Sequence, residues 1–222
     1  LRTTLTGFAV GWGIFILIFL LGAGNGLINA QMHQSERFLA NSIVVFGGVT
    51  SKPHNGFDRG RRISLENRDL LTTTNNFEEN IQETGATLWK PGNTFSLGAN
   101  YIASQNLCGA YPVKVKIDKI EIVHGRFIND IDLREKRKVI VLTQTQAKEL
   151  SRDVAALLGK YIKVNDTMFR VVGISKDDKS GENNTAHSPF TTISTIYNYG
   201  HRVDRIEFTF GGFFTAEESD AF

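Results

Sequence analysis

The sequence is poor in residues that build covalent or metal-bound frameworks. Cys108 is the single cysteine among 222 residues, so no disulfide within the chain is possible, and cysteine usage does not indicate a redox compartment. We expect Cys108 to be a small apolar residue in a strand rather than a reactive thiol. The five histidines do not fall at the spacings of metal ligands, and we expect no metal site.

An excess of charge of either sign is also missing. Beyond residue 30 the chain carries 24 basic and 23 acidic residues, so the formal net charge of this part is +1. Proteins that bind nucleic acids normally show a basic excess gathered on one face. The charge balance therefore argues against a nucleic-acid partner, and it gives no electrostatic reason for binding an acidic membrane surface.

Sequence motifs of enzymes are absent as well. Gly159-Lys160 lacks the upstream glycine that a phosphate-binding loop requires, and no His-Glu-x-x-His, Cys-x-x-Cys or Gly-x-Ser-x-Gly occurs. Asp177 and Asp178 lie in a polar stretch that could hold calcium, but the ligand pattern of a calcium loop is missing and a solvated loop is favoured. We expect no catalytic residue and no cofactor on this chain.

A long run without charge is present at the start. Leu5–Ile28 contains no charged residue, and as a helix it would extend ~36 Å, whereas a bilayer core is about 30 Å thick. The run is longer than the apolar region of a cleaved signal peptide, although Ala30 would be an acceptable cleavage position. We expect a membrane-spanning helix over residues 1–30, and Arg2 favours a cytoplasmic N-terminus.

Glycines recur at a spacing of four within this run. The two pairs are Gly7 with Gly11 and Gly22 with Gly26. Small residues at this spacing allow two membrane helices to approach closely. These four glycines are therefore candidates for helix packing in the membrane. Residues 31–41 keep a helical pattern, and we expect them to extend the membrane helix outward as a stalk.

Short alternating patterns dominate the rest of the chain and predict an α+β domain of mixed sheets and short helices. Residues 113–123 fit either a strand with a bulge or turn near Lys119 or a short helix. Pro91-Gly92-Asn93 predicts a turn, and 51–62 and 175–188 predict exposed loops. We expect strands at 42–49, 81–89, 94–97, 101–107, 139–142, 160–165, 168–174 and 203–210, helices at 64–75 (N-cap Ser64) and 143–151, and a strand passing into a helix at 190–199.

Both ends of the sequence indicate a fragment of a longer protein. The chain opens on Leu1 rather than methionine. Near the other end, Thr215 and Glu218 match a capping box, but Phe222 follows before a helix could be completed.

Three blocks, taken in order after the apolar helix, carry a family resemblance. They are Gly125-Arg126-Phe127-Ile128, Leu158-Gly159-Lys160-Tyr161-Ile162 and Phe169-Arg170-Val171-Val172-Gly173-Ile174, with Val139-Ile140-Val141-Leu142 between the first two. This arrangement resembles the MacB-like periplasmic domain of ABC transporter permeases, in the family that includes the lipoprotein-releasing and FtsX-type permeases. The positions that match the family motifs, in structural roles, are Gly125, Arg126, Phe127, Gly159, Lys160, Val171, Val172 and Gly173.

The resemblance implies a first membrane helix followed by a two-lobed extracytoplasmic domain. We place the membrane-proximal, porter-like lobe at 42–111 and 189–222 and the inserted distal lobe at 112–188. The family also implies a bacterial inner-membrane location and mechanotransmission, in which a cytoplasmic ABC ATPase binds ATP and drives movement in the periplasm. Implied partners are membrane lipid, a second permease copy, that ATPase and a periplasmic adaptor protein.

Within this family pattern, the glycines at 125, 159 and 173 are expected at turns and strand ends rather than at a ligand. Arg126 is expected to pair with Asp130, although contact with a partner is an alternative. An extracytoplasmic sensor domain of a signalling receptor would also show one span and an α+β domain. A secreted binding protein with an uncleaved signal is a third interpretation.

Overall fold

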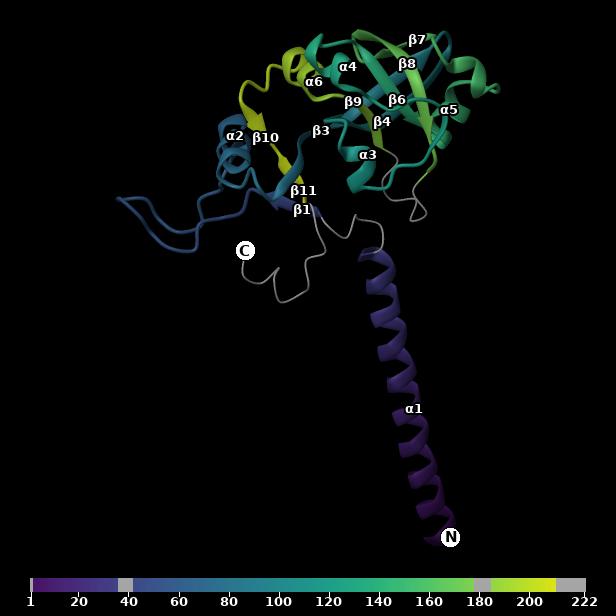
Figure 1. The fold of residues 1–222 in the computed structure, drawn as a ribbon. Helices are drawn as coiled ribbons and strands as arrows, with labels where there is room; N and C mark the ends of the chain where they lie inside the picture. Colours follow the sequence, from purple (N-terminus) through teal and green to yellow (C-terminus); the bar gives the residue numbers. More distant parts are fainter. Residues whose placement is uncertain (1, 36–41, 178–184, 211–222) are drawn as a thin grey trace. The chain divides into compact units, whose positions relative to one another are not determined.

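The computed structural model describes residues 2–35, 42–177 and 185–210. The chain divides into two compact units, Leu1–Ala40 and Asn41–Phe222. The first unit contains the helix α1 (Arg2–Ser35), and Figure 1 draws it as a single long helix. Within it, Thr6–Gly24 is long and apolar enough to cross a membrane, with a mean hydropathy of 2.1 and no part of it buried. The expected apolar helix is therefore present. Part of the expected stalk, residues 36–41, lies outside the described residues.

The second unit combines a large mixed sheet with short helices, as the sequence predicts. Its described strands are β1 (Ser42–Phe46), β2 (Leu65–Glu66), β3 (Ile81–Leu97), β4 (Asn100–Ala110), β5 (Ile122–Gly125), β6 (Val139–Thr143), β7 (Tyr161–Val164), β8 (Thr167–Ser175), β9 (Thr185–Pro189), β10 (Arg202–Val203) and β11 (Arg205–Phe210). Its helices are α2 (Asn67–Asn76), α3 (Lys114–Ile117), α4 (Asp130–Arg134), α5 (Gln144–Leu150), the short 3-10 helix η1 (Ala155–Leu157) and α6 (Phe190–Ile196).

The strand pairings close a ring. Among the described residues, a nine-stranded sheet has the order β1-β11-β3-β4-β9-β6-β8-β5, and β7 joins β8 to the far end of β3. Following the pairs from β3 through β4, β9, β6, β8 and β7 therefore returns to β3. Closure of this kind leaves fewer unpaired strand edges. Strands from both expected lobes share this sheet, and the lobe boundaries themselves stay a prediction.

A bend in β3 makes the ring possible. Pro91-Gly92-Asn93 was expected to form a turn, but β3 continues through it as one strand of 17 residues, so that prediction is wrong. The register against β4 shifts between Lys90 and Asn93, which marks a bulge, and Gly92 has a φ of +73°. A bulge bends a strand without ending it. The first half of β3 pairs with β11, and its last residues pair with β7.

Asn93 holds the bend together although it is fully buried. Its amide donates to the backbone carbonyls of Lys90 and of Gln105 on β4, the latter at 3.1 Å. Its side-chain oxygen accepts from the amide of Asn165 at 2.9 Å and from the hydroxyl of Tyr197 at 3.3 Å. The side chain thus connects β3, β4, the turn between β7 and β8, and the end of α6.

Two local predictions are confirmed by the cap and turn geometry. Thr143 and Gln146 form a reciprocal capping box at the start of α5. Asn165 has a φ of +49° in the tight turn between β7 and β8, as the hairpin signal predicted.

Two expectations are corrected, and one open alternative is decided. Glu66, not Ser64, caps α2, because its side chain and that of Asp69 form the capping box there. Of the two alternatives for 113–123, the short helix is the one observed: Lys114–Ile117 form α3, and the sharp change of direction follows at Lys119 with a φ of +49°. Residues 185–188, expected in an exposed loop, belong to the buried strand β9. The capping box at Thr215 and Glu218 lies outside the described residues.

The main hydrophobic core is formed by side chains of the curved sheet together with side chains of α2, α5, η1 and α6. Leu88, Phe95, Leu107, Leu142 and Phe169 are among its fully buried side chains. Ile193 of α6 packs directly against Gly109, where an added side-chain carbon would lie 2.9 Å from it. Burying a side chain of this size is favourable by about 1.5–3 kcal/mol, so burial of this core is a large favourable term in folding.

We predict that Asn93→Ala lowers the free energy of unfolding by about 2–3 kcal/mol, because it leaves buried partners on three neighbouring elements without a hydrogen bond. Urea unfolding of the detergent-solubilised chain, followed by the fluorescence of Trp89 in a Trp12→Phe background, measures the change. The matched control is Asn75→Ala on the exposed surface of α2, for which a change within about 0.5 kcal/mol is expected. Equal losses for the two variants would contradict the role given to Asn93.

Candidate functional site

The three motif blocks of the sequence meet at one place in the domain. Gly125 on β5 lies opposite Gly173 on β8, and the amide of Arg126 donates to the carbonyl of Val172 at 3.0 Å. Gly159 and Lys160 join further along the same edge of β8, opposite β6, and the amide of Gly159 donates to the carbonyl of Val171 at 2.8 Å. These segments are up to 48 residues apart in the sequence, from 125 to 173, and only the sheet brings them together.

Two of the glycines allow close contact between backbones. A side-chain carbon at Gly173 would overlap the carbonyl of Arg126, and one at Gly125 would overlap the carbonyl of Val172. Gly125 also has a φ of +75°, which side chains rarely adopt. Gly159 has a φ of +79° where the chain turns into β7. Within the described residues, each glycine has a backbone reason for its position.

Arg126 pairs with Asp132 rather than with the expected Asp130. Its guanidinium contacts the carboxylate of Asp132 at 2.5 and 3.1 Å, as a two-point contact. The prediction failed because residues 130–134 form the helix α4, which turns Asp132 inward and leaves Asp130 exposed. Asn129 caps that helix in a reciprocal box with Asp132. The pair ties β5 to α4 and leaves one face of Arg126 exposed.

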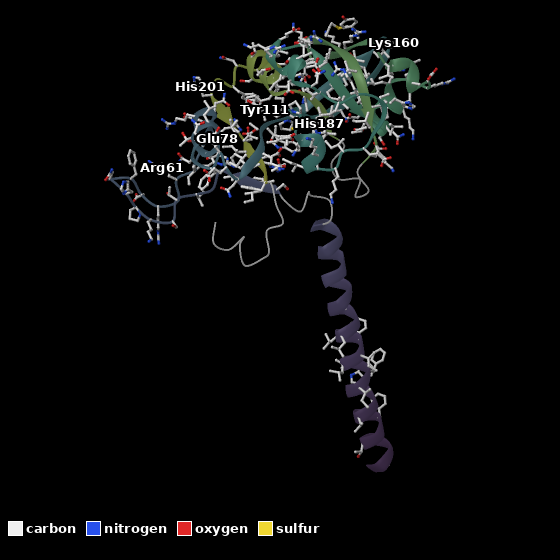
Figure 2. The ribbon with its side chains drawn as sticks, viewed as in Figure 1. Arg61, Glu78, Tyr111, Lys160, His187 and His201 are labelled. Atoms are coloured by element: carbon white, nitrogen blue, oxygen red, sulfur yellow. The ribbon has the colours of Figure 1, made fainter. Side chains whose placement is uncertain are left out.

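The remaining motif side chains divide between interior and surface. Phe127 is buried in a small cluster with Ile128 and Val141, with Val172 packed against it. The Phe127 ring lies 5.5 Å from the ring of His187. Val171 points into the main core, whereas Lys160 is exposed and Figure 2 shows it at the surface. Packing is therefore the role of most of these side chains.

A buried charged cluster lies beneath α3, on the face of the sheet away from the main core. Lys114 contacts Glu207 at 2.5 Å and Asp118 at 2.8 Å, and Lys114 and Glu207 are each 1 % exposed. Burial alone lowers the pKa of Lys114, but the two carboxylates outweigh it and the pKa lies above its ordinary value. Burial raises the pKa of Glu207, and Lys114 offsets part of that rise. The cluster holds α3 to β11.

Two neighbouring groups on this face are kept uncharged. Burial lowers the pKa of His187 to about 3, with Lys114 adding to the shift. Burial raises the pKa of Cys108 to about 12, so the thiol is not ionised near neutral pH. Cys108 lies in β4 and is fully buried, as expected of a small apolar residue. Neither group is suited to acid–base or nucleophilic chemistry.

Asp177, the disfavoured calcium candidate of the sequence, is hydrogen-bonded within the protein. Asp177 accepts from the backbone amide and the hydroxyl of Thr145, both at 2.9 Å, and Asp178 lies outside the described residues. Among the described residues, no group of three or more histidine, cysteine or acidic side chains is placed to hold a metal ion. For Gly7, Gly11, Gly22 and Gly26 on α1, packing against another helix stays a prediction, since a single chain does not test it.

Sequence reasoning missed an ordered arm within the expected loop of residues 51–62. Gly48–Ile63 folds back on itself, with Val49 opposite Arg62 and His54 opposite Phe57. Asn55 and Gly56 form its tip, with φ values of +50° and +81°. Asn-Gly is the strongest short signal for a hairpin turn and would have predicted this feature. Figure 2 shows Arg61 on this arm, away from the body of the sheet.

Comparison with known proteins identifies what the chain resembles as a whole. A family model described as the MacB-like periplasmic core domain matches residues 3–217. Among curated proteins, the macrolide export ATP-binding/permease protein MacB of Aggregatibacter actinomycetemcomitans is 21% identical over 210 residues, which is 93% of this chain and 32% of that protein. The protein of the same name from Campylobacter fetus subsp. fetus is 27% identical over 198 residues, 86% of this chain and 29% of that protein. The chain thus spans about a third of the length of these relatives.

Solved structures share the fold at low sequence identity. The periplasmic region of MacB from Actinobacillus actinomycetemcomitans gives a TM-score of 0.67 at 22% identity, covering 84% of this chain and 82% of that one. The extracellular domain of the noncanonic ABC-type transporter YknZ from Gram-positive bacteria gives 0.64 at 15% identity, covering 82% of this chain and 88% of that one. At these identities the structures establish the fold.

We predict that Asp132→Asn lowers the free energy of unfolding by about 1–3 kcal/mol, because it removes a charge-assisted contact with Arg126 at a buried position. Asp130→Asn, two residues away on the exposed side of α4, is the matched control and is expected to change it by less than about 0.5 kcal/mol. Thermal and urea unfolding of both variants measure the difference. A larger loss for Asp130→Asn would contradict the pairing described for Arg126.

Proposed function

Because the chain belongs to the family of MacB-like periplasmic core domains, we propose that it is the first membrane helix and the extracytoplasmic domain of an ABC transporter permease. The observation that carries this proposal is the extent of the family match, from residue 3 to residue 217. It takes in both the apolar helix and the α+β domain, which a likeness to an isolated sensor domain would not explain.

In this proposal α1 crosses the bacterial inner membrane. Thr6–Gly24 supplies 19 uncharged, mostly apolar residues, enough for about 30 Å of hydrocarbon when the helix is close to upright. The domain from about residue 31 onward lies in the periplasm, and Arg2 holds the N-terminus on the cytoplasmic side. Gly7 with Gly11, or Gly22 with Gly26, provides close contact with another membrane helix.

The domain transmits movement rather than performing chemistry. ATP is bound and hydrolysed by an ABC ATPase subunit or domain in the cytoplasm, and the membrane helices carry the resulting change to the periplasm. A domain whose strands close a ring through a bent β3 is suited to this work, because it moves as one body instead of deforming. The membrane-proximal lobe is placed at 42–111 and 189–222, and the inserted lobe at 112–188.

The partners follow from the same proposal. The chain works beside a second permease copy, with a cytoplasmic ABC ATPase and a periplasmic adaptor protein, in efflux or export. The relatives named for macrolide export support the direction of transport. They leave the substrate of this protein open, because the chain spans only about a third of their length.

The test is the membrane topology of the full-length protein. We expect reporter fusions placed beyond Phe222 to show three further membrane spans that end in the cytoplasm. Fusions within 42–210 are expected to report the periplasm, with a fusion before Thr6 as the cytoplasmic control. A single further span leading into a cytoplasmic domain would overturn the permease proposal and indicate a receptor. Cleavage after Ala30 would overturn the membrane anchor.

A further inference from the structure

The arm formed by Gly48–Ile63, here called the basic arm, is an ordered projection and not a loose loop. The amide of Thr50 donates to the carbonyl of Arg61 at 2.9 Å, and that of Ile63 donates to Gly48 at 2.8 Å. At the tip, His54 and Phe57 exchange two backbone hydrogen bonds of 3.1 and 3.0 Å. No residue of the basic arm is buried, so the arm adds nothing to the hydrophobic core.

Charge is concentrated on the basic arm. It carries Lys52, Arg59, Arg61 and Arg62 against one acid, Asp58, so its formal charge is +3. The other residues of 31–222 contain 20 basic and 22 acidic residues, a charge of −2. No described acidic side chain lies within ion-pair distance of the four basic ones. The arm is therefore a strong local field on a nearly neutral domain.

Apolar side chains accompany these charges at the surface. Val49 is 66% exposed and Phe57 is 58% exposed, and the guanidinium of Arg61 lies 4.5 Å from the centre of the Phe57 ring. Arginine and aromatic residues are enriched in protein interfaces and carry much of their binding energy. The composition of the arm is that of a contact surface for a protein.

The complementary charge lies on the same chain. The turn after α2, residues 77–80, holds Glu78 and Glu79, both exposed. No described basic side chain lies within ion-pair distance of either glutamate. Figure 2 shows Arg61 and Glu78 toward the same end of the domain, with the arm extending beyond it. The basic arm and the acidic turn thus lie toward the same end of the domain, and neither has an ion-pair partner among the described residues.

We propose that the basic arm of one copy binds the Glu78-Glu79 turn of a second copy, and that the reverse contact forms at the same time. A two-fold interface needs a surface that is complementary to itself, and a basic arm beside an acidic turn meets this condition. From Gly48 to Asn55 an extended strand reaches about 25 Å, enough to cross to a neighbouring domain. The inference rests on the proposed function, in which two permease copies work side by side. It names the residues through which the periplasmic domains of the two copies contact each other.

The test uses disulfide trapping in the full-length protein. Two differently tagged copies are co-expressed in membranes, one with Arg61→Cys and the other with Glu78→Cys, and are treated with a mild oxidant. The native Cys108 gives little background because it is fully buried and not ionised near neutral pH. A disulfide forms only where the two Cα atoms come within about 7 Å. Because the proposal places Arg61 of one copy beside Glu78 of the other, we expect about tenfold more mixed dimer than in the control.

The matched control pairs Arg61→Cys with Lys148→Cys. Lys148 is exposed on α5, which Figure 1 draws at the other end of the domain from the arm. In a second measurement, Arg59→Glu with Arg61→Glu is expected to abolish trapping between cysteines placed at Phe57 and Asn80. Adding Glu78→Lys with Glu79→Lys is expected to restore it, because both signs are then reversed. Restoration would not follow if the variants merely unfolded the arm.

Three results would overturn the proposal. Trapping no greater than the Lys148 control, while the tagged copies still co-purify, would show that the copies pair elsewhere and would leave the proposed function intact. Loss of co-purification itself would refute the pairing of permeases as well. Binding of the chain to anionic vesicles that depends on the four basic residues, with no trapping, would assign the arm to a lipid surface.

Discussion

The hydrogen bonds of Asn93 are the interaction on which the rest of the domain depends. One buried amide meets groups on β3, β4, the β7–β8 turn and α6, and it does so where β3 must bend. A straight β3 could pair with β11 and β4 but could not also reach β7. The ring of strands, and with it the enclosed core, follows from this bend. A force applied to one strand is then shared by its neighbours.

The second constraint is the apolar surface of α1. No part of the segment Thr6–Gly24 of α1 is buried within the chain. Burying its side chains in lipid is favourable by about 1.5–3 kcal/mol for each large apolar residue. An exposed apolar helix of this length is typical of a membrane span, which is the role proposed for α1. The motif residues have structural roles. Gly125 and Gly173 allow the backbones of β5 and β8 to approach closely, and Arg126 holds α4 through its contact with Asp132.

Caps and turns could be predicted from the sequence, because they depend on residues that are close together in the chain. The Thr143 cap and the Asn165 turn are set by neighbours in the chain, and both are confirmed. Asn93 and Asp132 were not foreseen, because a bulge and a buried pair depend on residues far away in the sequence or on a helix only five residues long. The hairpin of the basic arm could have been predicted, since Asn55 precedes a glycine, but the high polarity of these residues indicated a loop.

The most direct test of the whole account measures distances in the assembled transporter with its ATPase. Spin labels at Tyr101, which is 71% exposed at the β3–β4 turn, report the separation of the two copies, and labels at Glu79 and Lys148 report the shape of one domain. The account predicts that a non-hydrolysable ATP analogue shifts the distance between copies and leaves the distance within the domain unchanged. An unchanged separation between copies, or a deformed domain, would contradict transmission by a single rigid body.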